Sequence, residues 1–398
     1  MRGTKIELNV YVALLLVFNL FDAVMGSGPV LTLCRYTILI WSFAYYIKTV
    51  ANFLREPAIV KALTVFYLSL AIYGIIVLVE GKNFQALTNP IAPVNYLYKT
   101  SWSLLPIFAF YNFAKKGLLT KQFMLKWVYA CVVVATISYY FGMLQSLARH
   151  EGEEEATNNG GYIIISLLPM FIFLKDRSWP QYLLIAGAML LAILSMKRGA
   201  ALVGIVAVTI YFYYLFRNSK KSRKIQAFVA LMVAALSLFY VYDRLSTTSE
   251  YFQERVDDTI EGDTSGRDYI QGFLIDYYLN QYTPTEQLIG RGGNATLEVL
   301  GQFAHNDWIE LGINQGLLGM LLYLFFWIAF VKLLMKRNVP PEVKTALAMI
   351  FVIYFLKTFF SMSYSAYTFY AAMVFGYGIA VACDAGKAKK KHLLGLKQ

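Results

Sequence analysis

The stretch GQFAHNDWIELGINQGLLG, residues 301–319, joins a long polar loop to a very apolar segment. Asp307 and Glu310 have the spacing of a capping box, so a helix is predicted to begin near Asn306 or Asp307. The free N–H groups of its first turn would then lie next to His305. The sequence thus places one titratable imidazole where a helix enters an apolar region.

Three glycines follow on the same predicted helix. Gly312, Gly316 and Gly319 recur at i, i+4 and i+7 and so share one face. A stripe without side chains lets another helix approach closely. We therefore expect a close helix contact directly behind His305.

The composition is that of a polytopic membrane protein. Hydrophobic residues make up 58% of the 398 residues and charged residues 15%, and the mean hydropathy is +0.51. The net charge of +12 lies in short clusters between apolar runs, a pattern typical of cytoplasmic loops rather than of nucleic-acid binding. The three cysteines all lie in apolar runs, which argues against disulfides or a thiolate metal site. The first apolar run is interpreted as a retained anchor.

Apolar runs long enough to cross a bilayer predict about twelve transmembrane helices. With both termini in the cytoplasm, most Lys and Arg fall on the cytoplasmic side. The predicted divisions are transmembrane helices 1–9 at 1–242, a large extracytoplasmic loop at 243–307, transmembrane helices 10–12 at 308–386 and a basic cytoplasmic tail at 387–398. The runs lie at 8–25, 30–49, 60–79, 95–114, 126–146, 161–175, 181–196, 199–216, 226–242, 316–334, 344–362 and 367–383.

The large loop carries arginine as its only cation. Because the planar guanidinium binds phosphate or carboxylate with two hydrogen bonds, this choice indicates anion recognition. Apolar residues at helical spacing predict short helices at 248–262 and 267–281. The cations of the loop are Arg244, Arg255, Arg267 and Arg291.

The apolar run 181–216 is too long for one span and is interrupted only by Lys197, Arg198 and Gly199. We expect the chain to turn there, near the outer membrane boundary. Arg198 would then need a partner, because an unpaired charge is costly in that position.

Each candidate site residue has a second interpretation. An isolated His305 can simply bond a backbone carbonyl, or act as a base that the helix N-terminus keeps neutral. Arg35 and Lys357, inside spans near the outer face, either extend to the interface or join Arg198 around a diphosphate. GRGGN at 290–294 is either a turn or an N–H-lined anion nest. No metal-binding pattern occurs, and no metal or other cofactor is predicted.

Several motifs together carry a family resemblance. AHNDWIELGINQGLLG at 304–319 resembles the His-Asn, apolar, Glu and spaced-glycine hallmark of the O-antigen polymerase and O-antigen ligase superfamily. SMKRGA at 195–200 is similar to its Ser-x-Arg-Gly turn, and EGDTSGRDYI at 261–270 to the Ser-Gly-Arg element of its periplasmic loop. LIGRGGN at 288–294 is similar to its Gly-x-Gly-x-Gly stretch.

The resemblance implies an all-α membrane glycosyltransferase of GT-C-like fold in the bacterial inner membrane, with its active site on the periplasmic side. Its donor and acceptor would be glycans on undecaprenyl pyrophosphate, and a chain-length regulator is a further candidate partner. By motif, Arg198 and Arg267 would bind the pyrophosphate and His305 would be the base of a metal-independent, inverting reaction. Second-rank candidates for the anionic site are Arg255, Arg291, Arg35 and Lys357, and Glu310 would orient His305.

Two alternatives remain open. An O-antigen ligase would transfer the glycan to a lipid A core instead of to another repeat unit. A polysaccharide or lipid-linked oligosaccharide transporter would line its path with the intramembrane cations. The long aromatic-rich loop favours the polymerase, and the lack of related halves disfavours a transporter.

Overall fold

The chain folds almost entirely into helices, most of them long and apolar. The structure, a computed structural model, describes residues 2–26, 28–81, 84–85, 90–149, 158–174, 178–249, 253–254, 257 and 266–393. Helices satisfy their own backbone hydrogen bonds, which is what a chain surrounded by lipid requires. The apolar helices therefore indicate a membrane-embedded protein.

The first half of the chain consists of α1 (Arg2–Met25), α2 (Pro29–Ala51), η1 (Phe53–Arg55), α3 (Ala58–Glu80), β1 (Phe84–Gln85), β2 (Pro90–Ile91), α4 (Val94–Lys115), α5 (Lys121–Arg149), α6 (Gly160–Ile165), α7 (Leu168–Phe171), η2 (Ile172–Leu174) and α8 (Ser178–Leu194). The second half contains α9 (Arg198–Asn218), α10 (Lys221–Thr248), α12 (Arg267–Asn280), α13 (Pro284–Ile289), α14 (Ala295–Leu300), α15 (Asp307–Leu334), α16 (Pro341–Lys357) and α17 (Phe369–Leu393). The two short strands pair in antiparallel orientation.

Most of each apolar run found in the sequence is helical in the structure, but the run at 161–175 is broken into α6, α7 and η2, and the run at 344–362 leaves the helix after Lys357. The run at 161–175 is almost fully buried among other helices, and Pro169 lies in the first turn of α7, just after the break between α6 and α7. Six helices of the described chain are long and apolar enough to cross a membrane: Lys5–Met25, Pro29–Ala51, Ala58–Glu80, Lys121–Ala148, Arg198–Asn218 and Asp307–Leu334. Twelve crossings thus stay a prediction.

The turn expected at 197–199 is confirmed. Helix α8 ends at Leu194 and α9 begins at Arg198, with Met196 between them in the left-handed backbone region at φ 54°. The helix expected at 267–281 is also confirmed as α12. Most of the helix expected at 248–262 lies outside the described residues.

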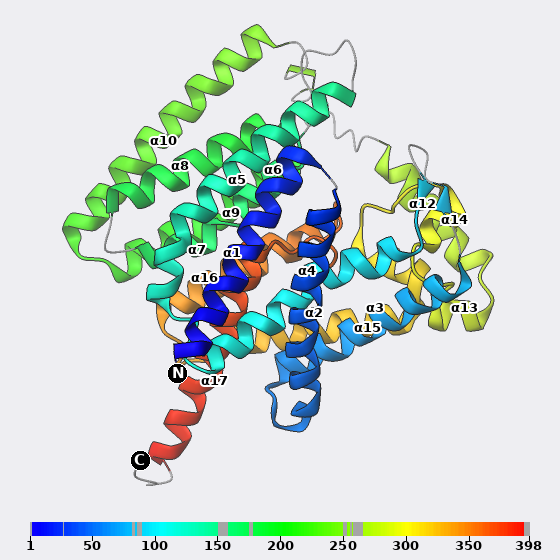
Figure 1. Ribbon diagram of the computed structural model, residues 1–398. Coiled ribbons are helices and arrows are strands. Elements are labelled where there is room, and N and C mark those ends of the chain that lie inside the picture. The colour runs from blue at the N-terminus through cyan, green and yellow to red at the C-terminus, as the bar shows by residue number, and fades with distance from the viewer. Residues whose placement is uncertain are drawn as a thin grey trace.

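Two groups of helices give the molecule its shape (Figure 1). One large core joins helices from α1 to α9 with α15, α16 and α17. Helices α12 to α14 gather at the right of Figure 1, where α3 and α15 reach them side by side. They share with the start of α15 a second, smaller core formed by Ile270, Leu274, Tyr282, Ala295, Ala304 and Ile313.

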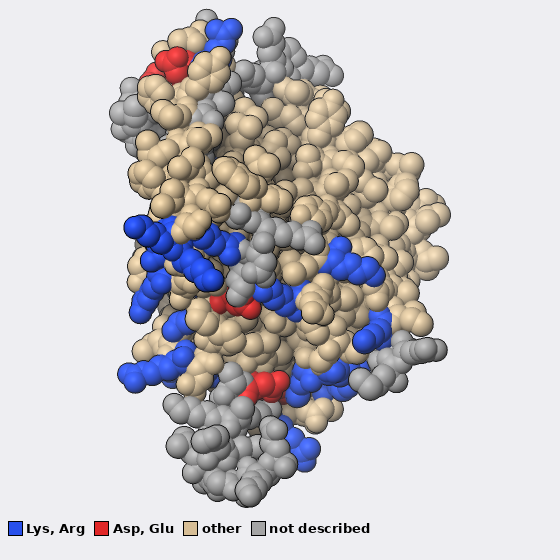
Figure 2. Space-filling view, turned by 90° about the vertical axis from the view of Figure 1, so that its left-hand side faces the viewer, with Lys and Arg blue, Asp and Glu red and all other residues tan. Residues whose placement is uncertain are grey.

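Charge is unevenly distributed over the surface. Figure 2 shows the side of α10, where Lys and Arg gather across the middle and lower parts and most of the upper surface is uncharged. The turn between α9 and α10 contributes the cluster RNSKKSRK at 217–224. This clustering at helix ends is the pattern from which the sequence predicts the cytoplasmic side.

Candidate functional site

The site begins where α15 begins. Asn306 is its N-cap, and the Asn306 side-chain oxygen accepts hydrogen bonds from the backbone N–H groups of Trp308 (2.9 Å) and Ile309 (3.3 Å). The predicted start of the helix is therefore confirmed, but the capping group is Asn306 rather than an Asp307–Glu310 box. His305 directly precedes the cap, half-buried, with its backbone in the left-handed region at φ 51°.

Asp307 points into the protein instead of capping the helix. It is 0% exposed and accepts hydrogen bonds from the N–H groups of Ser363 (2.8 Å) and Tyr364 (3.2 Å) and from the hydroxyl of Tyr323 (2.7 Å). It thereby ties the start of α15 to the segment that follows α16. Sequence reasoning missed this role, although an acidic residue at the mouth of an apolar helix was the available signal.

Glu310 is buried one turn further along α15 and fixes the loop that carries His305. One carboxylate oxygen accepts from the N–H of Ala304 (2.9 Å), and the other from Thr296 Oγ1 (2.7 Å) and Asn314 Nδ2 (3.0 Å). Because Ala304 immediately precedes His305, Glu310 holds the backbone next to the imidazole. This contact is of the kind that the predicted orienting role requires.

His305 lies near two cations from distant parts of the chain. Burial, and then the charges of Arg267 and Lys197, lower the pKa of His305 below its ordinary value of 6.5. Arg267 is the first residue of α12, and Lys197 precedes α9. The imidazole is therefore neutral at neutral pH and can accept a proton. The sequence predicted neutrality from the helix N-terminus, whereas in the structure burial is the largest cause.

The turn between α8 and α9 is packed tightly into the same region. A Cβ at Gly199 would meet the hydroxyl of Tyr162 and, at 2.6 Å, the ring of Phe360. Only a residue without a side chain fits there, so the neighbouring Lys197 and Arg198 are brought close to these aromatic groups. Arg198 is half-buried and engaged in an interaction within the protein.

Lys357 joins this region from the end of α16. It is 5% exposed, its Nζ lies 4.6 Å from the ring centroid of Tyr162, and its charge interacts with Asp307. The snorkelling interpretation is therefore wrong for Lys357, because its side chain is buried in the protein. Tyr162, which sequence reasoning did not identify, lies between Lys357 and Gly199 and also interacts with the charge of Arg267.

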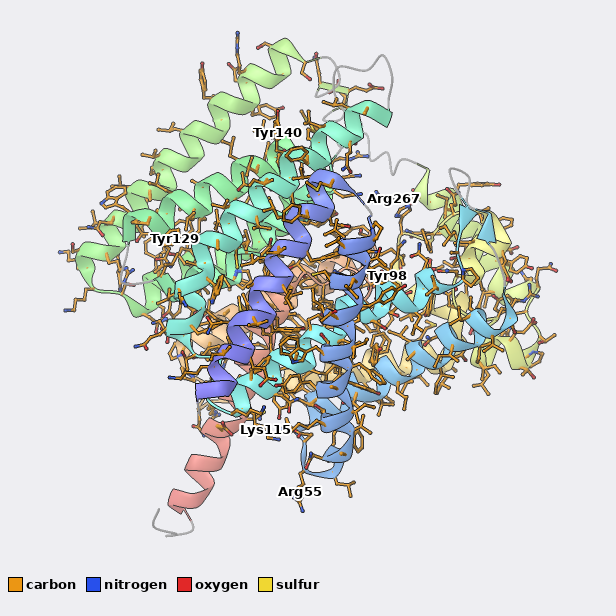
Figure 3. All side chains as sticks on the ribbon, viewed as in Figure 1. Arg55, Tyr98, Lys115, Tyr129, Tyr140 and Arg267 are labelled. Carbon is orange, nitrogen blue, oxygen red and sulfur yellow. The ribbon has the colours of Figure 1, made fainter. Side chains whose placement is uncertain are left out.

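The carbonyl groups after α16 connect the parts of the site. Helix ends leave carbonyls without partners inside the helix. Here the carbonyls of Thr358, Phe359 and Phe360 accept hydrogen bonds from Asp307 N (2.8 Å), Asn306 Nδ2 (3.2 Å) and Arg267 Nη1 (2.9 Å). In Figure 3, Arg267 lies on the opposite side of Tyr98 from Arg55, in η1 after α2, and from Lys115, at the end of α4.

Of the three glycines expected to form one smooth face of α15, only Gly316 is approached closely by another helix. At Gly316 the backbone leaves the helical conformation (φ 62°, ψ −160°), so α15 is broken there, and a Cβ would lie 2.5 Å from the carbonyl carbon of Leu288 at the end of α13. The close approach expected behind His305 is confirmed for Gly316. By contrast, the nearest neighbours of Gly312 and Gly319 are side chains of α15 itself.

The GRGGN segment, 290–294, hydrogen-bonds to the backbone of α15 just before the break at Gly316. It does not form an open anion nest. The N–H groups of Arg291 and Gly292 donate to the carbonyls of Ile313 (3.2 Å) and Asn314 (2.9 Å), just before Gly316. These two N–H groups are therefore already used within the protein. Hydrogen bonding holds the loop against the first segment of α15.

Two further predicted cations have structural partners away from His305. The Arg291 side chain bonds Glu286 (2.7 Å) and the hydroxyl of Tyr277 (2.8 Å), and hydrogen bonds from Thr283 and from Arg291 lower the pKa of Glu286 to about 2. Arg35 pairs with Asp22 at 3.1 Å. The side chains of Arg291 and Arg35 are therefore not placed to bind a ligand together with the residues around His305. Arg255 lies outside the described residues.

The site as a whole contains a neutral imidazole, two cationic segments beside it and a buried lysine. Among the described residues, no three His, Cys, Asp or Glu side chains are grouped as metal ligands. No protein-family model and no curated protein matches the chain.

Proposed function

We propose that the protein is a GT-C-like membrane glycosyltransferase that polymerises glycan repeat units carried on undecaprenyl pyrophosphate into O-antigen or capsular polysaccharide. The observation that supports it most is the convergence of His305, Arg267 and Lys197 from three distant segments. A neutral base beside cations is suited to removing a hydroxyl proton while a diphosphate leaves. The motif resemblance supplies the substrate class.

In the proposed reaction, an acceptor sugar hydroxyl attacks the anomeric carbon of the donor glycan. The new C–O bond forms as the bond to the pyrophosphate oxygen breaks, with inversion, and the hydroxyl proton passes to His305. The leaving pyrophosphate takes the bonding electrons, and Arg267, Arg198 and Lys197 stabilise its charge. Lys357 and Tyr162 form the wall behind these cations, and Glu310 positions His305 through Ala304.

The direct test is incubation of the purified protein with lipid-linked repeat unit, with and without EDTA. A ladder of longer glycans in both reactions supports a metal-independent polymerase. Transfer only to an added lipid A core would instead indicate a ligase. Absence of any covalent product would favour transport and contradict the proposal.

Substitution of the base sharpens the test. His305→Ala is expected to lower the rate about 10²- to 10⁴-fold, and Arg198→Ala about 10²- to 10³-fold. Both variants should express and fold normally. His392→Ala, in the basic C-terminal segment, is the matched control and should polymerise at the normal rate. Normal chain formation by His305→Ala would refute the catalytic assignment.

A further inference from the structure

A groove with a volume of about 620 Å³ lies between α2, α3 and α4. Its walls are mainly apolar and include Leu39, Ile40 and Phe43 of α2, Ile75 of α3 and Leu105 of α4. Such a surface suits a hydrocarbon chain. The function proposed above does not use it.

One end of the groove is polar. The guanidinium of Arg35 lies 4.7 Å from the ring centroid of Tyr98, and further along the same two helices Tyr46 lies 5.1 Å from Phe108, so α2 and α4 run parallel. Arg35, Asn95 and Lys99 consequently lie toward one end, and Phe43 and Leu105 toward the other. At 1.5 Å per helical residue, the eight residues from Arg35 to Phe43 span about 12 Å.

The lining of the groove includes two cations and no carboxylate. Arg35 already pairs with Asp22, and the charge of Lys99 interacts with the buried Glu310. Nε of Arg35 and Oδ1 of Asn95 are nevertheless buried without a hydrogen-bond partner among the described residues. Buried polar atoms normally have partners, so hydrogen bonding at this end of the groove is incomplete among the described residues. The groove is thus shaped and charged for an anionic lipid with a polar head.

The polar end of the groove reaches the candidate active site. Nζ of Lys99 lies 5.0 Å from the ring centroid of Phe303, two residues before His305. Glu310, which interacts with Lys99, also holds Ala304 between those two residues. A head group bound at Lys99 would therefore lie next to the loop that carries the base.

We infer that this groove binds the prenyl chain and pyrophosphate of the acceptor, a second undecaprenyl-pyrophosphate-linked glycan. The inference rests on the proposed polymerase function, because that reaction needs two lipid-linked molecules at once. The donor pyrophosphate is held at Arg267, Arg198 and Lys197. The acceptor enters from the other side, with its pyrophosphate at Lys99 and Arg35 and its glycan extending past Phe303 to His305.

The test counts bound lipids on the purified full chain by native mass spectrometry, with undecaprenyl pyrophosphate as the probe. The wild-type protein should bind two molecules. Ala71→Phe, which fills the groove, should bind one, and Lys99→Ala should weaken one of the two binding events about tenfold, the loss expected for one well-placed charge contact. Ile72→Phe is the matched control: it introduces the same side chain at the adjacent position, which is 47% exposed on the outside of α3, and should bind two.

Measurements of binding and of catalysis together distinguish failure of the groove assignment from failure of the proposed polymerase function. Ala71→Phe should also raise the KM for lipid-linked acceptor in the polymerisation assay, whereas Ile72→Phe should not. Two bound probes in Ala71→Phe would overturn the groove assignment even if the wild type makes polymer. Equal competition by phosphatidylglycerol would also overturn it, as it would make the occupant an ordinary membrane lipid. Absence of polymer from the wild type would instead refute the proposed function.

Discussion

At the scale of single residues, the central feature is an imidazole kept neutral by its surroundings. His305 combines partial burial with two nearby positive charges, and both effects oppose protonation. An ordinary surface histidine has neither. The same cations that disfavour imidazolium are placed to attract an anionic leaving group, so one arrangement serves both requirements of the proposed reaction.

The first prediction concerns pH. Because the base acts in its neutral form, the rate should fall as the pH drops through the lowered pKa of His305, which places the acid limb below pH about 6.5. Arg267→Gln removes one of the charges that lower this pKa, so the acid limb should move to higher pH. Arg244→Gln, an exposed arginine of α10, should leave the limb unchanged. The measurement is initial rate against pH, and an unmoved limb in Arg267→Gln would contradict the electrostatic account.

The second prediction concerns Asp307. Asp307→Ala leaves two N–H groups and one hydroxyl without their acceptor, at a cost of about 1–3 kcal/mol for each unsatisfied buried group. Asp307→Asn keeps one carbonyl oxygen and should lose less. Thermal unfolding in one detergent measures both. Asp276→Ala, on the exposed face of α12, is the control and should change stability by less than about 0.5 kcal/mol. Equal melting temperatures for Asp307→Ala and the wild type would show that these bonds contribute little.

At the scale of elements, α15 is two helical segments in one. The first, 307–315, carries Asp307 and Glu310 and packs on α12 to α14 through Ile313, with Leu311 in the large core, while the second continues in the large core. The apolar run read from the sequence begins at 316, where the break lies. The break lets the segment next to His305 take its direction from α13 and from GRGGN.

This geometry gives the third prediction. Gly316→Ala forces a side chain into a conformation that costs about 1–3 kcal/mol, with its Cβ against the backbone of α13. Gly312→Ala is the matched control, because its Cβ would meet only the flexible Met320 side chain, at 3.3 Å. We expect a large loss of stability and activity for the first and little for the second. Equal melting temperatures for the two variants would show that the break is dispensable.

The sequence predicts the start of α15, the turn before α9 and helix α12, because caps, charge interruptions and helical spacing are local signals. It does not predict the break at Gly316, since glycines at i, i+4 and i+7 equally suit an unbroken helix. It also misassigns Arg291, whose pairing with Glu286 and Tyr277 depends on how α12 and α13 pack. Asp307 and Tyr162 were missed because their importance arises from contacts with residues distant in the chain. Asp307 bonds Ser363, 56 positions away, and Tyr162 contacts Gly199 and Lys357, which are 37 and 195 positions away.

At the scale of the whole molecule, the sequence predicts one end rich in Lys and Arg and an opposite end that carries the large loop with α12 to α14. The N- and C-termini lie near each other in Figure 1, away from α12 to α14. The even number of membrane crossings that the sequence predicts would place both termini on the same side.

The fourth prediction tests that orientation. Single cysteines are introduced after replacement of Cys34, Cys131 and Cys383, one at the exposed Thr285 of α13 and one at the exposed Lys221, the first residue of α10. A membrane-impermeant maleimide added to bacterial spheroplasts should label Thr285→Cys and not Lys221→Cys. Lysis should make both reactive, which controls for buried thiols. The opposite labelling pattern would reverse the topology.

The carbonyl groups that follow α16 have a further consequence. The turn that carries the base and the arginine proposed to hold the leaving group are each bonded to this one short run of backbone, from Thr358 to Phe360. The distance between His305 and Arg267 is therefore fixed by their shared attachment to this backbone segment. It does not depend on the course of the long loop between them. With both groups held by the same backbone segment, the residues that line the sugar site can change to suit different sugars. The spacing between the proton acceptor and the departing phosphate is then preserved.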